Sequence, residues 1–237
     1  MADDRLIVAL DVHSMEDMQA LVEQLDDSVS YYKVGMELFY RVGANALSYL
    51  HEKNKRIFLD LKLHDIPNTV AEGLCSLAAL HADMMNVHAL GGYEMMKTAV
   101  QKVREHASRA NIPTPKLIAV TILTSISSDT WQEMGFSQKI SDEVLRLALL
   151  AKKAGMDGVV ASPQEASVIR AECGSDFLIV TPGIRPAGAN IDDQSRIATP
   201  VAALKNGATH LVIGRPIRAA ANPKAAAEAI LHEMERA

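Results

Sequence analysis

The chain has 237 residues and a mass of 25.7 kDa; 49% of its residues are hydrophobic and 22% are charged. A folded chain of this size buries about 70% of the surface that it exposes when unfolded, which excludes a disordered protein and a domain that needs disulfides or metals for its core. The formal net charge is −5 with both signs mixed along the chain, so no basic face or tail is available for a nucleic-acid backbone. A small anionic ligand would need only a local positive pocket.

The first residues read MADDRLIVALDV, with acids ahead of a very short apolar stretch, which is not the pattern of a signal peptide. No apolar window approaches the ~20 residues of a membrane helix. Cys75 and Cys173 belong to no CxxC pair, and no histidine stands at metal-ligand spacing from them, which is typical of buried free thiols in a reducing compartment. These features predict a cytoplasmic protein without a membrane segment or a metal.

Short apolar runs rich in β-branched residues alternate with amphipathic helical stretches. The predicted strands are Leu6–Val12, Tyr31–Met36, Arg56–Leu63, Met84–Leu90, Lys116–Leu123, Gly158–Ser162, Phe177–Gly183 and His210–Ile217. The predicted helices are Met15–Leu25, Ala44–Glu52, Thr69–Ala79, Glu94–Ala107, Ser141–Ala154, Pro163–Ala171, Pro200–Lys205 and Pro223–Glu235. Most of the strands are apolar throughout, as expected for a parallel sheet covered on both faces.

Eight strands that alternate with eight helices in this length predict an α/β fold, a single-domain (β/α)8 TIM barrel over residues 1–237. A doubly wound open sheet is the competing architecture. It would usually carry G-x-G-x-x-G after the first strand, whereas this strand runs into LDVHSMED. The barrel is therefore preferred.

Charged residues stand at the carboxyl ends of the first three predicted strands, where the loops of a barrel build an active site. They are Asp11, Lys33, Asp60, Lys62 and Asp65. The two-residue period of a strand places Asp60 and Lys62 on one face. Buried charges need partners, so we expect lysines and aspartates of neighbouring strands to pair in an alternating array.

The last two strands carry signals for an anion. About 12 irregular residues follow Thr181-Pro-Gly183, and we expect a lid over residues 184–196. Strand eight ends in Gly214 and Arg215, where a glycine N–H and a guanidinium suit a phosphate. After strand five, Thr124 and Ser125 fit either the amide edge of a heterocycle or a helix cap. The roles of His64 and His88 stay open.

The segment Asp60-Leu-Lys-Leu-His-Asp-Ile-Pro-Asn-Thr69 resembles the D-x-K-x-x-D-I-P-N-T signature of the orotidine 5′-phosphate decarboxylase family. Further pieces stand in the family's order: ALD at 9–11, YKVG at 32–35, LTS at 123–125, TPGIRP at 181–186 and IGRPI at 213–217. The resemblance covers nearly the whole chain. It implies a homodimeric barrel that converts orotidine 5′-phosphate to UMP and CO2, the last step of pyrimidine biosynthesis, with no metal or organic cofactor.

The resemblance also implies a role for each matching residue. Lys62 would donate a proton to C6, Asp60 would face the substrate carboxylate, and Lys33 and Asp11 would hold the ribose. Asp65 and Thr69 would reach the site of the partner subunit. Thr124 or Ser125 would meet the pyrimidine, and the phosphate and its lid would use Arg185, Gln194, the Gly214 N–H and Arg215.

Two other functions fit parts of this pattern. The first is a Mg²⁺-dependent sugar-phosphate decarboxylase or aldolase, such as hexulose-phosphate synthase, which shares the D-x-K-x-x-D strand. Those relatives use an acidic residue on strand two, whereas Lys33 would repel Mg²⁺ there. The second is a barrel that binds a nucleotide without catalysis, although binding alone does not explain clustered buried charge.

Overall fold

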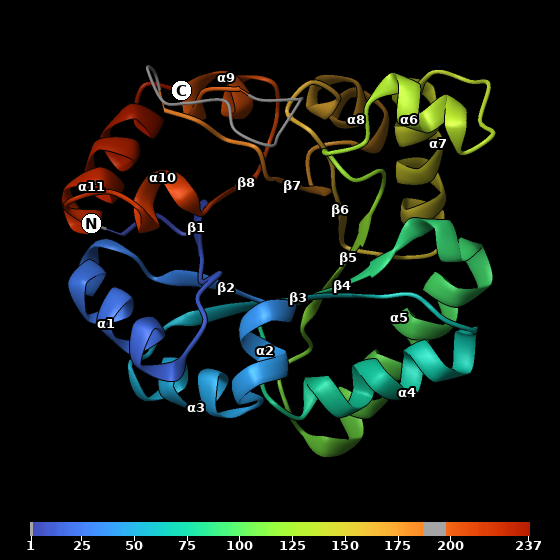
Figure 1. Ribbon diagram of the computed structural model, residues 1–237. Coiled ribbons are helices and arrows are strands. Elements are labelled where there is room, and N and C mark those ends of the chain that lie inside the picture. Colours follow the sequence, from blue (N-terminus) through green and yellow to red (C-terminus); the bar gives the residue numbers. More distant parts are fainter. Residues whose placement is uncertain (1, 187–197) are drawn as a thin grey trace.

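The computed structural model describes residues 2–186 and 198–237. Eight parallel strands pair in chain order, and β8 pairs with β1 to close a barrel that the helices surround (Figure 1). The strands are β1 (Leu6–Ala9), β2 (Tyr31–Gly35), β3 (Arg56–Leu63), β4 (Met84–His88), β5 (Lys116–Val120), β6 (Gly158–Val160), β7 (Leu178–Thr181) and β8 (His210–Ile213). The single-domain (β/α)8 barrel predicted from the sequence is confirmed.

Helices follow every strand. They are α1 (Met15–Leu25), α2 (Met36–Val42), α3 (Asn45–Glu52), α4 (Pro67–Ala78), α5 (Gly92–Ala110), α6 (Ser128–Glu133), α7 (Ile140–Lys153), α8 (Ala166–Cys173), α9 (Pro200–Lys205), α10 (Arg215–Arg218) and α11 (Pro223–Met234), with short 3-10 turns η1 (Asp26–Ser28) and η2 (Ala89–Gly91). In residues 2–186 and 198–237, none of them combines the length and apolar character that a membrane crossing requires.

Most strands end earlier than predicted because the apolar runs continue into the loops at their carboxyl ends. Three short helices, α2, α6 and α10, were not predicted. The run His210–Ile217, for example, divides into β8 and the single turn of α10. These three helices have only four to seven residues, so the 3.6-residue period repeats at most about twice in each of them.

Side chains at the helix N-termini fix where several helices begin. Ser14 accepts a hydrogen bond from the Asp17 amide at α1, and Thr199 accepts one from the Ala202 amide at α9. These caps satisfy backbone donors that have no partner within the helix. Cys75 and Cys173 are free and buried, as predicted.

The core has an outer layer between strands and helices and an inner layer that fills the barrel. The inner layer is a cluster contributed by six strands: Ile7, Tyr31, Phe58, Met84, Ile118 and Val180. Phe58 also lines the pocket at the carboxyl ends of the strands. The cluster therefore forms the floor of that pocket, which opens at the carboxyl ends of the strands.

Candidate active site

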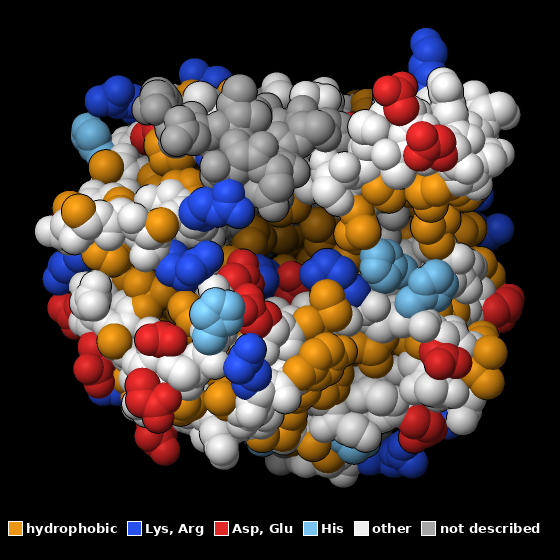
Figure 2. All heavy atoms as spheres, viewed as in Figure 1, with side chains coloured by type: hydrophobic (Ala, Val, Ile, Leu, Met, Phe, Trp, Pro, Cys, Tyr) orange, Lys and Arg blue, Asp and Glu red, His pale blue; other side chains and the backbone are white. Residues whose placement is uncertain are grey.

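A pocket of about 300 Å³ opens at the carboxyl ends of the strands. Its lining combines apolar side chains of the strands with polar groups, among them Thr124 and two aspartates. Figure 2 shows the opening as a hollow with an apolar interior and charged side chains of both signs along one side. Convergent polar groups in a concave apolar site are typical of small-molecule binding.

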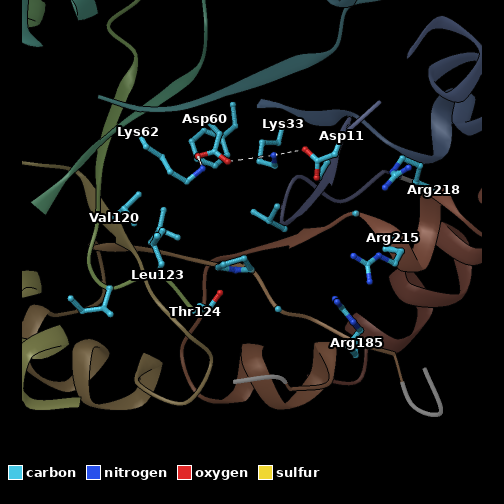
Figure 3. A pocket seen from close by; sticks show the side chains of 18 residues that line it. Asp11, Lys33, Asp60, Lys62, Val120, Leu123, Thr124, Arg185, Arg215 and Arg218 are labelled. Atoms are coloured by element: carbon cyan, nitrogen blue, oxygen red, sulfur yellow. Dashed lines mark hydrogen bonds and ion pairs between the residues drawn. The ribbon is translucent and has the colours of Figure 1, made fainter. Parts of the chain in front are cut away.

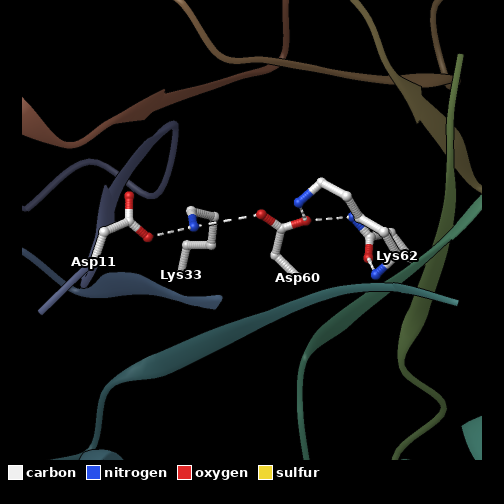
Figure 4. Close-up of polar contacts among 5 residues, drawn as sticks. Asp11, Lys33, Asp60 and Lys62 are labelled. Atoms are coloured by element: carbon white, nitrogen blue, oxygen red, sulfur yellow. Dashed lines mark hydrogen bonds and ion pairs between the residues drawn. The ribbon is translucent and has the colours of Figure 1, made fainter. Parts of the chain in front are cut away.

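Four charged side chains form one continuous chain of ion pairs across this pocket (Figure 4). Lys33 Nζ lies 2.9 Å from Asp11 Oδ1 and 3.4 Å from Asp60 Oδ2. Lys62 Nζ donates to the other oxygen of Asp60, Oδ1, over 2.7 Å. The order Asp11, Lys33, Asp60, Lys62 alternates in sign, as expected because buried charges need partners.

The array holds its inner members in their charged forms. Burial alone would lower the pKa of Lys33, but the facing carboxylates of Asp60 and Asp11 outweigh it and raise the pKa. Burial would likewise raise the pKa of Asp60, and Lys33 and Lys62 lower it instead. The Asp60 carboxylate, buried beside two lysines, therefore stays ionised, and Lys33 keeps its proton.

Lys62 has a backbone conformation unusual for a residue with a side chain. Its φ is 55°, in the left-handed region, and the pairing of β3 with β4 shifts register between Leu59 and Leu63. The Lys62 amide donates to Asn86 Oδ1 over 2.8 Å, and Asn86 Nδ2 donates to Asp60 Oδ1 over 2.7 Å. Simple strand alternation is thus interrupted at Lys62, and Asn86 holds both charged residues in place.

Gly35, the last residue of β2, leaves room for the array. A Cβ at this position would lie 2.9 Å from Lys33 Nζ and 3.4 Å from Asp11 Oδ1. Any side chain here would therefore displace the ammonium group. A Cβ at Gly214 would in turn lie 3.6 Å from Asp11 Oδ2.

Arginines gather at the end of the pocket remote from Lys62 (Figure 3). Arg185 is buried, and its Nη1 donates to the Ile184 carbonyl over 3.1 Å. Gly214 is the N-cap of α10, and Arg215 is the first residue of that helix. Arg218, at the end of the same turn, also lines the pocket. This end suits a phosphate.

The other residues predicted for the site divide into three groups. Thr124 is buried in the pocket wall, whereas Ser125 is exposed and does not line the pocket. Asp65 and Thr69 are exposed and lie outside this pocket. Gln194 and most of the expected lid over 184–196 lie outside the described residues.

His64 and His88 lie beside each other near Lys62, with ring centroids 5.6 Å apart. Burial lowers the pKa of His88, and the neighbouring charges of His64 and Lys62 lower it further. A second positive charge beside Lys62 is thereby disfavoured.

Sequence reasoning did not single out Asn86, Gly35 or Arg218. Asn86 is the polar residue in the otherwise apolar run Met84–Val87, and this isolated polarity was a usable signal. Gly35 stands in the YKVG piece at 32–35, but its role beside Lys33, like that of Arg218, depends on which side chains the barrel brings next to it.

Comparison with known proteins agrees with this geometry. The sequence profile of the Orotidine 5'-phosphate decarboxylase / HUMPS family matches residues 4–230. The orotidine 5'-phosphate decarboxylase of Trichlorobacter lovleyi is 50% identical over 233 residues, covering 98% of this chain and 96% of that protein. That of Moorella thermoacetica is 49% identical over 235 residues, covering 99% and 93%.

Solved structures show the same similarity. The crystal structure of orotidine 5'-phosphate decarboxylase from Lactobacillus acidophilus superimposes with a TM-score of 0.85 at 43% identity, covering 98% of this chain and 99% of that one. An uncharacterized conserved protein from Geobacillus kaustophilus gives a TM-score of 0.84 at 36% identity, covering 97% and 99%. With the profile matching nearly its full length, the chain belongs to the orotidine 5'-phosphate decarboxylase / HUMPS family.

Proposed function

We propose that the protein decarboxylates orotidine 5′-phosphate to UMP and CO2, the last step of pyrimidine nucleotide synthesis. The observation that carries this proposal is the Lys62 ammonium group, held 2.7 Å from a buried carboxylate inside the pocket. Family membership and the named relatives support the same reaction.

The reaction requires negative charge to be stabilised on a ring carbon. The bond between C6 and the carboxylate carbon breaks, and its electron pair stays on C6 as CO2 leaves. Lys62 then gives its proton to C6, which forms the C6–H bond of UMP, and the amine regains a proton from solvent. Because Lys62 is already oriented by Asp60, its charge stabilises the carbanion without reorganisation at the moment of reaction.

Asp60 has a second role in this proposal. The substrate carboxylate would lie against Asp60, whose charge is maintained by Lys33 and Lys62. Repulsion between the two carboxylates raises the energy of the bound substrate and falls as neutral CO2 forms.

The remaining pocket residues would bind the nucleotide. Lys33 and Asp11 would hold the ribose, and Thr124 would hydrogen-bond the pyrimidine. The phosphate would lie among Arg185, Arg215 and the Gly214 N–H, with Gln194 and the lid over 184–196 as further predictions. Binding at this remote end would supply free energy that orders the reacting end.

We further propose a homodimer in which Asp65 and Thr69 reach the site of the partner. Both residues are exposed, and neither belongs to the described lining of the pocket that holds Lys62 in their own chain. Large apolar side chains at this end of the barrel are exposed too. Ile66, the residue after Asp65, is 67% exposed, and Tyr40 on α2, the helix after the neighbouring strand β2, is 71% exposed. Apolar side chains exposed in this way are typical of a surface that another chain covers.

The proposed reaction needs no metal or organic cofactor, and the proposed location is the cytoplasm. The Mg²⁺-dependent sugar-phosphate chemistry of HUMPS-type relatives is the main alternative. Lys33 lies between two carboxylates that would otherwise be free to bind a cation.

The decisive experiment is a turnover assay on the purified full chain with EDTA present. Loss of orotate absorbance with formation of UMP is expected, at a rate unchanged when Mg²⁺ is added. Activity on a hexulose phosphate that EDTA abolishes would instead indicate the metal-dependent alternative. Binding of UMP without any turnover would indicate a non-catalytic barrel.

A further inference from the structure

We propose that Arg218 is a third phosphate-binding arginine, which makes the pocket selective for a nucleotide with a 5′-phosphate over the corresponding nucleoside. This inference rests on the proposed function and extends it to a residue outside the family signature pieces described above.

The first argument is position. Arg218 follows Arg215 by three residues in α10, and residues with this spacing lie on the same side of a helical turn. Both side chains line the pocket, and Figure 3 shows them with Arg185 around the end that lies away from Lys62. The three guanidinium groups therefore surround the place proposed for the phosphate.

The second argument is an unsatisfied donor. Nε of Arg218 is buried and has no hydrogen-bond partner among residues 2–186 and 198–237. No ion pair joins Arg218 to a carboxylate within those residues, although Asp17 lines the groove on its other side. Leaving a buried charged donor without an acceptor costs free energy, which an anionic ligand in the pocket would recover.

The third argument is charge balance. The described lining of the pocket contains five cationic side chains and two carboxylates: Lys33, Lys62, Arg185, Arg215, Arg218, Asp11 and Asp60. The excess is three positive charges. Orotidine 5′-phosphate carries one carboxylate and a phosphate of about −1.5 to −2 at neutral pH, a total of about −2.5 to −3. An excess of three positive charges balances the full charge of this ligand, whereas the excess of two that remains without Arg218 falls short of it.

The test compares substrates with and without the phosphate. Arg218→Ala should raise KM for orotidine 5′-phosphate roughly 10- to 100-fold, the usual effect of losing one charge-assisted hydrogen bond. For orotidine, kcat/KM should stay within about twofold, because no phosphate is present to contact. Arg218→Lys should give a KM for orotidine 5′-phosphate between those of the wild type and Arg218→Ala, since lysine keeps the charge but lacks the planar guanidinium group.

Arg109→Gln is the matched control, because it removes a positive charge from an exposed position at the end of α5, away from the pocket. This variant should leave the kinetic parameters for orotidine 5′-phosphate and for orotidine unchanged. Thermal melting of each variant checks folding, and Arg218→Gln replaces the alanine variant if that one unfolds.

Calorimetric titration with UMP and uridine gives a readout that does not depend on turnover. Arg218→Ala should weaken UMP binding and leave uridine binding unchanged. Equal losses for both ligands, or no loss for UMP, would overturn the role of Arg218. If the wild-type chain binds UMP but does not decarboxylate orotidine 5′-phosphate, the proposed function is wrong. The titrations with UMP and uridine would still show whether Arg218 contacts the phosphate.

Discussion

Asn86 holds the backbone of Lys62 in its left-handed conformation: the Lys62 amide donates to Asn86 Oδ1 over 2.8 Å at a φ of 55°. The same amide side chain donates to Asp60, the ion-pair partner of Lys62. One residue of β4 thus fixes both the backbone and the counter-ion of the proposed proton donor. Strain of this kind persists where surrounding contacts hold it, and it clusters at functional sites.

Replacing Lys62 tests the proton donor. Lys62→Ala should abolish turnover while UMP binding stays measurable, because Lys33, the other lysine in the described lining of the pocket, is proposed to hold the ribose and not to protonate C6. The checks are a steady-state assay and a calorimetric titration of UMP. Lys153→Ala, at the end of α7, is a control that should behave as wild type. A near-normal kcat in the Lys62 variant would remove this role.

Asn86→Ala tests the positioning of Lys62. It removes two hydrogen bonds at a buried position and should destabilise the fold by about 1–3 kcal/mol. We expect kcat to fall roughly 10- to 100-fold with little change in KM, since substrate contacts remain but Lys62 is no longer oriented. A variant that loses stability but keeps kcat would show that Asn86 is only structural.

Gly35→Ala tests the space beside Lys33. The new Cβ would meet Lys33 Nζ at 2.9 Å, so the ammonium must move away from Asp11. We expect kcat/KM to fall at least tenfold, which is the same free-energy change as a shift of about one pKa unit. The backbone should stay unstrained, because the φ of Gly35 is −94°. Steady-state kinetics with a thermal melt measure both effects. Wild-type kinetics in a folded variant would contradict the need for this contact.

Mixed subunits test the shared site. Asp65→Ala and Lys62→Ala homodimers should each be inactive. A hybrid dimer contains one site with Lys62 from one chain and Asp65 from the other, so mixing should restore activity.

Mixing Asp60→Ala with Lys62→Ala is the matched control, because both residues belong to the same chain's site and no hybrid site is intact. Subunit exchange is verified by differently tagged chains. Exchange without recovery in the Asp65 mixture would argue against a contribution across the interface.

The lowered pKa of His210 predicts that the folded chain loses stability in acid. Burial, with a smaller contribution from Arg56, lowers its pKa to about 4 from an ordinary 6.5. Below pH 6.5 His210 is protonated in the unfolded chain, whereas in the folded chain it stays neutral until the pH approaches 4. Stability is therefore complete above pH 6.5 and is lost as the pH falls towards 4, by about 3 kcal/mol.

Urea unfolding at several pH values measures this loss. His210→Gln should flatten the dependence between pH 6.5 and 4, whereas His232→Gln, on the exposed face of α11, should not. Equal slopes for wild type and His210→Gln would show that other groups account for the acid sensitivity.

The amino-acid sequence alone determined the barrel, because the alternation of apolar runs and amphipathic stretches is a local property of the chain. It also placed Asp60 and Lys62 towards the end of the third strand and Lys33 on the second strand, on the side of the barrel where active sites of this fold lie. Only the tertiary structure decided that Thr124 rather than Ser125 lines the pocket, that the pairing of β3 with β4 shifts register beside Lys62, and that Arg218 lines the same pocket as Lys62. Each of these features depends on what the other strands of the closed barrel bring next to the residue, so no local pattern records it.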